Sequence, residues 1–217
     1  MNLRFPPIYP ITDIALSGLS IPEQIRRLVA GGATLIQVRA KDASSRELFA
    51  AGAEAVRFAR ENKARIIIND RVDIAMALHA DGVHLGQSDL SPLEARKLLG
   101  EKAIIGFSTH SLEQAVEASG LPIDYLAFGP IFPTSTKEDP DPVVGLDLLV
   151  EVKRAAGGLP IVAIGGIDER NLPSVLAAGA DSAAMVAGIM ADPDGISERV
   201  RSLLRLALER SSVNKII

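Results

Sequence analysis

The chain has 217 residues, of which 47% are hydrophobic and 23% charged, and its formal net charge is −4. This composition is typical of a folded globular protein, and the length suits one domain with a large buried core. A mildly acidic chain without a block of lysine and arginine does not fit a nucleic-acid groove or an anionic membrane surface. The lack of cysteine excludes disulfides, thiolate nucleophiles and iron–sulfur ligation.

The first ten residues lack the basic and apolar regions of a signal peptide, and no apolar run is long enough to span a membrane. We therefore expect a cytoplasmic protein whose partners are small molecules rather than nucleic acid or a membrane. Self-association into a homo-oligomer is left open by the sequence.

Short β-rich segments alternate with amphipathic stretches along the whole chain. We expect strands over residues 8–13, 35–39, 65–69, 82–86, 103–108, 125–129, 161–165 and 182–187. Most are nearly continuous runs of Ile, Val, Leu and Ala, as in parallel strands that are covered on both faces. Between them the apolar residues recur with helical spacing, as in 21–30, where Pro22 suits the first turn and Gly31 the end.

Eight such units predict a single α/β domain, a (β/α)8 TIM barrel over residues 1–210 with a flexible tail at 211–217. Doubly wound sheets also alternate strands and helices. However, the first strand is followed by Thr12-Asp13-Ile14 and not by the Gly-x-Gly-x-x-Gly of a dinucleotide-binding fold.

Polar residues collect where the predicted strands end, which in this fold is the mouth that carries the chemistry. Gln37, Arg39 and Lys41 are alternate positions and so project to one side of the second strand, which suits a polyanion. Asp70 follows the third strand and Asp89 the fourth. Either could cap a helix, but two carboxylates beside cations also fit Mg²⁺ bridging to a pyrophosphate, and we favour that interpretation.

Three further loops carry candidate phosphate-binding groups. After the sixth strand, Thr134, Ser135 and Thr136 precede Lys137, without the glycine spacing of a Walker A loop. The seventh and eighth strands end in Gly165-Gly166 and Ala187-Gly188, the loops that commonly bind phosphate in this fold.

The three histidines are less informative. We expect His79 on a helix face as a packed or an edge residue, and His84 as a hydrogen-bonded residue of the barrel interior. His110 is the one candidate for acid–base chemistry, because it follows a strand end.

Taken together, these motifs resemble the thiamine-phosphate synthase family. The resemblance lies in residues 36–41, 68–73, 80–87, 106–110, 129–137 and 163–167, and it extends from about residue 9 to 192. It implies an Mg²⁺-dependent transferase that joins an aminopyrimidine diphosphate to a thiazole phosphate by a dissociative mechanism, with the charge on the leaving pyrophosphate met by cations. Ala40 and Ala187 depart from the Glu and Ser common in the family.

The resemblance also implies a role for each matching residue. The pyrimidine diphosphate would be held by Gln37, Arg39, Lys41, Asn69, Ser108 and Lys137, of which Arg39, Lys41, Ser108 and Lys137 would act in catalysis. Asp70 and Asp89 would bind Mg²⁺. The thiazole phosphate would be held by Thr134, Ser135, Thr136, Gly166, Val186 and Ala187.

Two alternatives share this fold. A thiazole tautomerase would use His110 and would require neither the Thr134–Lys137 loop nor the two aspartates. A phosphate sensor without activity would be expected to lack some of the cations or metal ligands, all of which are present here.

Overall fold

The computed structural model describes residues 5–134 and 141–213. The strands are β1 (Ile8–Pro10), β2 (Leu35–Val38), β3 (Arg65–Asn69), β4 (Gly82–Leu85), β5 (Ile104–Thr109), β6 (Tyr125–Phe128), β7 (Ile161–Ile164) and β8 (Ser182–Met185). The helices are α1 (Ile14–Ser17), α2 (Ile21–Ala30), α3 (Ser45–Glu61), α4 (Val72–Ala77), α5 (Pro92–Leu99), α6 (Leu112–Ala118), α7 (Gly145–Ala155), α8 (Leu172–Ala177), α9 (Ala187–Met190) and α10 (Ile196–Val213).

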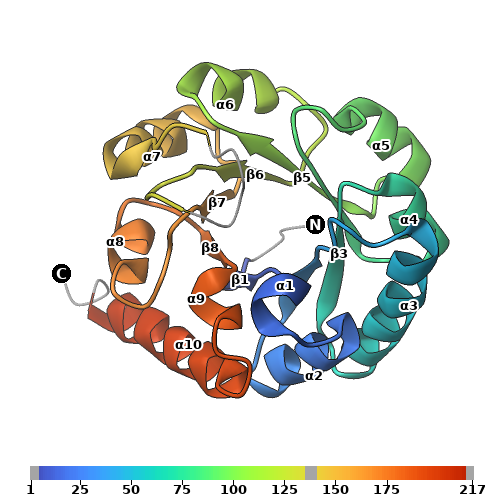
Figure 1. The fold of residues 1–217 in the computed structure, drawn as a ribbon. Coiled ribbons are helices and arrows are strands. Elements are labelled where there is room, and N and C mark those ends of the chain that lie inside the picture. The colour runs from blue at the N-terminus through green and yellow to red at the C-terminus, as the bar shows by residue number, and fades with distance from the viewer. Residues whose placement is uncertain (1–4, 135–140, 214–217) are drawn as a thin grey trace.

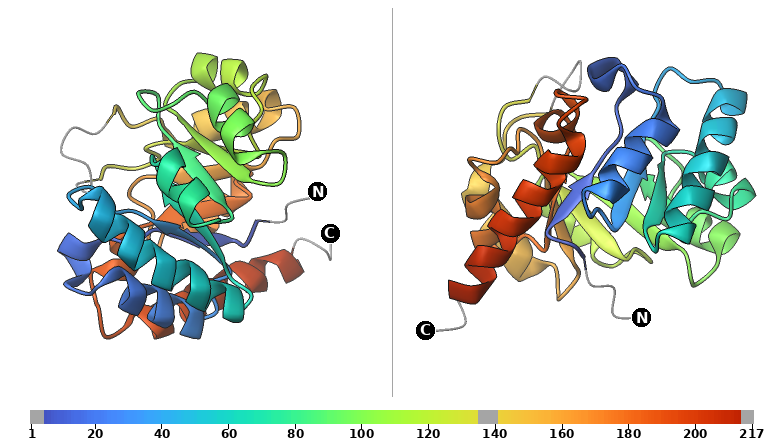
Figure 2. Two further views of the ribbon diagram at one scale, coloured as in Figure 1. Left: turned by 90° about the vertical axis from the view of Figure 1, so that its right-hand side faces the viewer. Right: turned by 90° about the horizontal axis from the view of Figure 1, so that it is seen from below.

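The strands form a parallel barrel inside a ring of helices, as Figure 1 shows, and this confirms the predicted fold class. β1 pairs with β8, and the remaining neighbours follow in chain order down to β2. The barrel closes between β1 and β2, where Ile11 bridges to Gln37 and the Thr12 N–H donates to the Gln37 carbonyl at 2.9 Å. In Figure 2, α10 lies along the outside of the barrel beside α2 and α8.

Alternation along the strands divides the apolar residues between two cores. The larger core lies between strands and helices and includes Ile36, Ile66 and Ile68. The smaller one fills the barrel interior and includes Tyr9, Ile67, Tyr125 and Val162. Residues on the interior side therefore point either into this plug or, at the strand ends, into the mouth.

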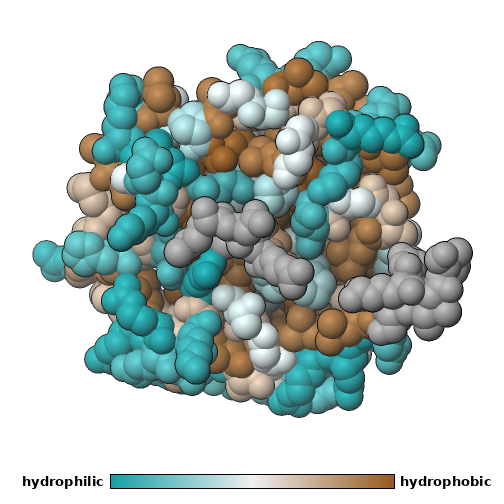
Figure 3. All heavy atoms as spheres, turned by 180° about the vertical axis from the view of Figure 1, so that it is seen from behind, coloured by the Kyte–Doolittle hydropathy of each residue, from teal (hydrophilic) through white to brown (hydrophobic). Residues whose placement is uncertain are grey.

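The face of the molecule opposite the view of Figure 1 carries hydrophilic side chains around its rim, with hydrophobic residues between them (Figure 3).

Three aspartates hold the amino ends of neighbouring strands together. Asp81, Asp124 and Asp181 each precede an even-numbered strand, and each accepts the backbone N–H at the start of the strand before it at 2.8 Å. A carboxylate that accepts a backbone N–H in this way makes a charge-assisted hydrogen bond. The repeated clamp therefore sets the register at the end of the barrel opposite the mouth.

The predicted boundaries were wrong at several ends. β1 stops at Pro10, and Ala187 begins α9 and does not end β8. His79 follows the end of α4, is exposed and has a φ of 49°, so of the two expected environments it has that of an edge residue and not of a packed one. α10 extends to Val213, residues 214–217 lie outside the described part, and the domain end at 210 stays a prediction. No helix in the described ranges is long and apolar enough to cross a membrane.

Candidate active site

The carboxylates of Asp70 and Asp89 meet at the carboxyl ends of β3 and β4. Desolvation in the mouth, the negative charge of Asp89 and a hydrogen bond with Asp89 raise the pKa of Asp70 to about 6, while Arg39 acts in the opposite direction. Asp70 has a left-handed φ of 62°, which is uncommon outside glycine and is found preferentially at functional positions. The structure thus places two carboxylates and a cation in one cluster.

Neither aspartate caps a helix. α5 is capped by Ser91, whose hydroxyl accepts the Glu94 N–H, and α4 has no side-chain cap. Asp89 instead folds back on its own loop, where one carboxylate oxygen accepts the Gly86 N–H at 2.7 Å. The helix-cap alternative is therefore wrong for both residues.

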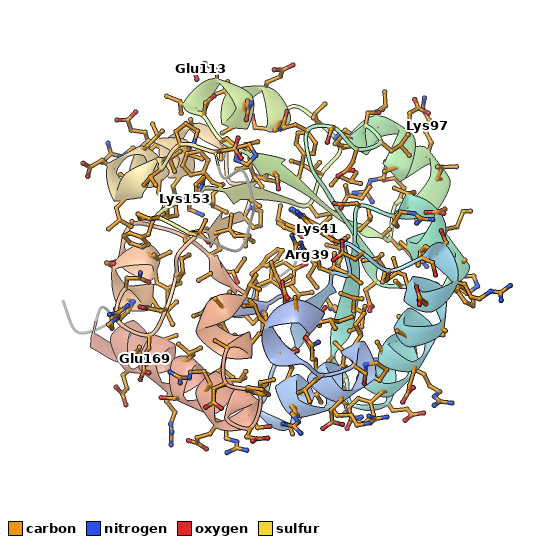
Figure 4. All side chains as sticks on the ribbon, in the orientation of Figure 1. Arg39, Lys41, Lys97, Glu113, Lys153 and Glu169 are labelled. Atoms are coloured by element: carbon orange, nitrogen blue, oxygen red, sulfur yellow. The ribbon has the colours of Figure 1, made fainter. Side chains whose placement is uncertain are left out.

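Two cations from the end of β2 lie near the middle of the barrel (Figure 4). Arg39 is half-buried, its backbone N–H donates to the Thr12 hydroxyl at 2.9 Å, and its guanidinium is 3.5 Å from the Asp13 carboxylate. Lys41 is exposed and has no carboxylate partner in the part of the chain that the structure describes. Arg39 is thus held in place by the end of β1, while Lys41 presents its charge to solvent at the mouth.

The uncharged polar candidates line the floor of the mouth. Gln37 is buried on the interior side of β2, and its amide nitrogen donates to the Tyr9 hydroxyl at 3.4 Å. Asn69 ends β3 and hydrogen-bonds to the Asp70 carboxylate, which lowers the pKa of that group. The Ser108 hydroxyl, on β5, lies 2.9 Å from Nε2 of His84. These three side chains come from three strands, and Asn69 contacts the cluster of charges directly.

The loops after β6 and β7 are packed tightly against each other. The Phe132 N–H donates to the Gly165 carbonyl at 3.1 Å. Gly166 has a φ of 61°, and a Cβ atom there would lie 2.4 Å from the Pro133 carbonyl oxygen. Only glycine satisfies both the backbone angle and this close approach. The turn therefore fixes Pro133, the residue before Thr134, against Gly166, while the phosphate site itself stays a prediction.

The rest of that predicted site is described only in part. Ser135, Thr136 and Lys137 lie outside the described residues. Val186 and Ala187 stand where β8 passes into α9, close to the β7 loop, because a Cβ atom on Gly188 would lie 2.8 Å from the Ile167 carbonyl oxygen. A hollow of about 390 Å³ opens on this side, lined by residues that include Asp168, Ala187 and Arg199. Its lining does not include the Asp70–Asp89 pair.

His110 is half-buried after β5. Its Nδ1 lies 2.7 Å from the Gly129 carbonyl oxygen and 3.6 Å from the Asp141 carboxylate. The ring is thus tied to the loop after β6. Its place at a strand end agrees with the sequence, while proton transfer by this residue stays a prediction.

Three residues that contact the candidate site were not predicted from the sequence. Asp13 pairs with Arg39, and Tyr9, which accepts from the Gln37 amide, forms a buried pair with Tyr125. The tyrosines share the alternating phase of the interior strand residues, which is the one sequence signal that could have found them.

The two aspartates suit a metal ion whose remaining coordination positions are filled by the bound substrate and water. Within residues 5–134 and 141–213 no three His, Asp or Glu side chains gather as a set of metal ligands. Mg²⁺ commonly takes one or two carboxylates and fills its remaining positions with water and substrate phosphates. A pair of carboxylates beside cations fits that pattern.

The chain is similar to known proteins of one family. The family model described as thiamine monophosphate synthase matches residues 8–189. The thiamine-phosphate synthase of Persephonella marina is 44% identical over 197 residues, which cover 90% of this chain and 93% of the relative. The thiamine-phosphate synthase of Chlorobium phaeobacteroides is 46% identical over 177 residues, which cover 81% of this chain and 85% of the relative.

Among solved structures, the thiamine phosphate pyrophosphorylase of Pyrococcus furiosus aligns with a TM-score of 0.85 and 36% identity over 94% of this chain and 96% of that one. The thiamine phosphate pyrophosphorylase of Bacteroides thetaiotaomicron has a TM-score of 0.65 at 18% identity, which shows a shared fold. From the matched residues, the identities and the coverage it follows that this chain belongs to the thiamine monophosphate synthase family.

Proposed function

We propose that this protein condenses 4-amino-2-methyl-5-hydroxymethylpyrimidine diphosphate with hydroxyethylthiazole phosphate, giving thiamine phosphate and pyrophosphate. Membership of the family supports the reaction. The observation that carries the assignment within this chain is the meeting of Asp70, Asp89 and Arg39 at one end of the barrel. This arrangement has both signs of charge, and a diphosphate that is bound partly through a divalent cation needs both.

The chain's own residues would bind and orient the reactants. Arg39 and Lys41 would neutralise the diphosphate oxygens as negative charge grows on the leaving group. Asp70 and Asp89 would hold Mg²⁺, which supplies further positive charge to the same oxygens when it is bound. The bond from the pyrimidine methylene carbon to the diphosphate oxygen breaks first, and the thiazole nitrogen then donates its electron pair to that carbon. No side-chain nucleophile is required.

The thiazole phosphate would sit across the loops after β6, β7 and β8. Thr134 and the backbone around Gly166, Val186 and Ala187 are the described part of this subsite, and Ser135, Thr136 and Lys137 would complete it. We further propose that the protein works in the cytoplasm on these small molecules.

The coupling assay tests the proposal directly. We expect thiamine phosphate to form from the two substrates with Mg²⁺ and its formation to stop with EDTA. Turnover of the thiazole tautomer without coupling would instead identify the tautomerase, and binding without turnover would identify the sensor. Asp89→Ala should nearly abolish coupling at ordinary Mg²⁺ concentration. Asp73→Ala, which removes an exposed carboxylate paired with Arg71, is the matched control and should keep it.

A further inference from the structure

A continuous chain of hydrogen bonds runs through the barrel interior from Gln37 to Ser108. The Gln37 amide nitrogen donates to the Tyr9 hydroxyl at 3.4 Å, and the hydroxyls of Tyr9 and Tyr125 are 3.2 Å apart. The Tyr125 hydroxyl is 2.9 Å from Nδ1 of His84, and Nε2 of the same ring is 2.9 Å from the Ser108 hydroxyl. The two residues that end this chain of hydrogen bonds, Gln37 and Ser108, belong to the proposed pyrimidine subsite.

A glycine in β5, Gly106, leaves the space that this chain of hydrogen bonds needs. Gly106 pairs in register with His84 on β4 and with Tyr125 on β6, so it lies between them. A Cβ atom on Gly106 would be 2.0 Å from Cζ of Tyr125. The tyrosine ring therefore crosses over β5 at this point and stacks on the His84 ring, with centroids 5.6 Å apart and planes inclined by 19°.

Which group donates and which accepts in each of these hydrogen bonds follows from Gln37 at one end. Because the Tyr9 oxygen accepts from the Gln37 amide nitrogen, the Tyr9 hydrogen is available to Tyr125. Tyr125 can then donate to Nδ1 of His84. A neutral imidazole carries one proton, and a ring whose Nδ1 accepts from the Tyr125 hydroxyl carries that proton on Nε2. Nε2–H then donates to the Ser108 oxygen, and the Ser108 hydrogen is left for a ligand.

The two ends thus present opposite groups to the mouth. The Gln37 amide oxygen has no hydrogen-bond partner in the described part of the chain, and the Ser108 hydroxyl has none there besides His84. Gln37 therefore offers an acceptor and Ser108 a donor. An aminopyrimidine carries the complement, which is an exocyclic N–H donor and unprotonated ring nitrogens. A 4-oxo pyrimidine carries a carbonyl acceptor and a ring N–H donor, which is the reverse.

We propose that Tyr9, Tyr125 and His84 are positioning residues that fix these two roles. They thereby make the site selective for a 4-aminopyrimidine over its 4-oxo analogue. The selectivity rests on the proposed function, whereas the proton position on His84 does not.

The proton position is measured on the unliganded wild-type protein. ¹⁵N-labelled histidine and long-range ¹H–¹⁵N spectra at pH 7 show which ring nitrogen of each of the three histidines is protonated, and His84→Gln assigns the signals. We expect hydrogen on Nε2 and none on Nδ1 of His84. Hydrogen on Nδ1 would reverse the donor and acceptor in every hydrogen bond from Gln37 to Ser108 and overturn the proposal.

Selectivity is measured as the ratio of kcat/KM for the 4-amino and the 4-oxo pyrimidine diphosphates. Tyr125→Phe removes the donor to His84 and frees the Ser108 hydroxyl to rotate. We expect the ratio to fall about tenfold, mainly through KM for the amino substrate, as for the loss of one buried hydrogen bond. His84→Gln keeps an amide donor near Ser108 and should retain more of the ratio than His84→Ala.

Thr109→Val is the matched control. It deletes a buried hydroxyl on the same strand, which donates to the Ala127 carbonyl at 3.1 Å and lies outside the chain of contacts. It should lower stability and leave the ratio unchanged. An active wild type whose ratio is the same in Tyr125→Phe would refute the positioning role alone. A wild type with no coupling activity would refute the proposed function, and the histidine spectra would still report the proton position.

Discussion

The buried His84 ring makes the stability of this protein depend on pH in a defined direction. Its pKa is lowered from 6.5 to about 4, mainly because burial disfavours the charged ring, and the charge of Asp89 opposes this shift slightly. Above pH 6.5 the ring is neutral in both the folded and the unfolded states. Between about 6.5 and 4 the unfolded chain binds a proton that the folded chain does not, so the free energy of unfolding falls.

The size of this effect follows from the shift. Each pKa unit is worth about 1.4 kcal/mol, so His84 should cost the folded state roughly 3 kcal/mol by pH 4 and no more below it. The same loss is expected to be absent from His84→Gln, which cannot titrate.

Urea unfolding of both proteins, in Mg²⁺-free buffer from pH 7 to 4, measures the difference. Asp70, whose pKa is raised to about 6, works in the opposite direction because its folded state binds the proton first. That contribution is common to both proteins and cancels when the two curves are subtracted. Parallel stability curves for the wild type and His84→Gln would refute the reasoning.

Three further predictions concern stability. Gly106→Ala should lower the free energy of unfolding by about 3 kcal/mol, because its methyl group would overlap the Tyr125 ring; an unchanged Tm would contradict this. Ser182→Ala should raise it by about 1 kcal/mol, since the buried Ser182 hydroxyl has no hydrogen-bond partner among the described residues; a less stable variant in urea would be the contrary result. Asp124→Ala should cost about 2 kcal/mol by leaving the Ile105 N–H without its acceptor, and faster hydrogen exchange at that amide would report the loss.

The strands and the mouth could be predicted from the sequence because their signals are local. Apolar runs mark the strands, and α2 has the bounds that its periodicity predicts. The polar ends of neighbouring parallel strands must converge, so the sequence alone predicts that Asp70 and Asp89 lie close together.

The tyrosine–histidine contacts could not be predicted in the same way. They depend on the register of β4, β5 and β6, which sets Gly106 between His84 and Tyr125, and register is a property of pairing rather than of any one segment. The end of the first strand was also predicted wrongly: β1 stops at Pro10, and beyond it the side chains of Thr12 and Asp13 contact Arg39. In both cases tertiary contacts decided the outcome.

The aspartate clamps have a practical consequence for changing what this protein accepts. They lie at the amino ends of the strands, while Gln37, Ser108 and the phosphate loops lie at the other end. Loops at the ligand end can therefore be exchanged or randomised while the opposite end keeps the cylinder assembled. A library built on this protein should vary the former and leave Asp81, Asp124 and Asp181 untouched.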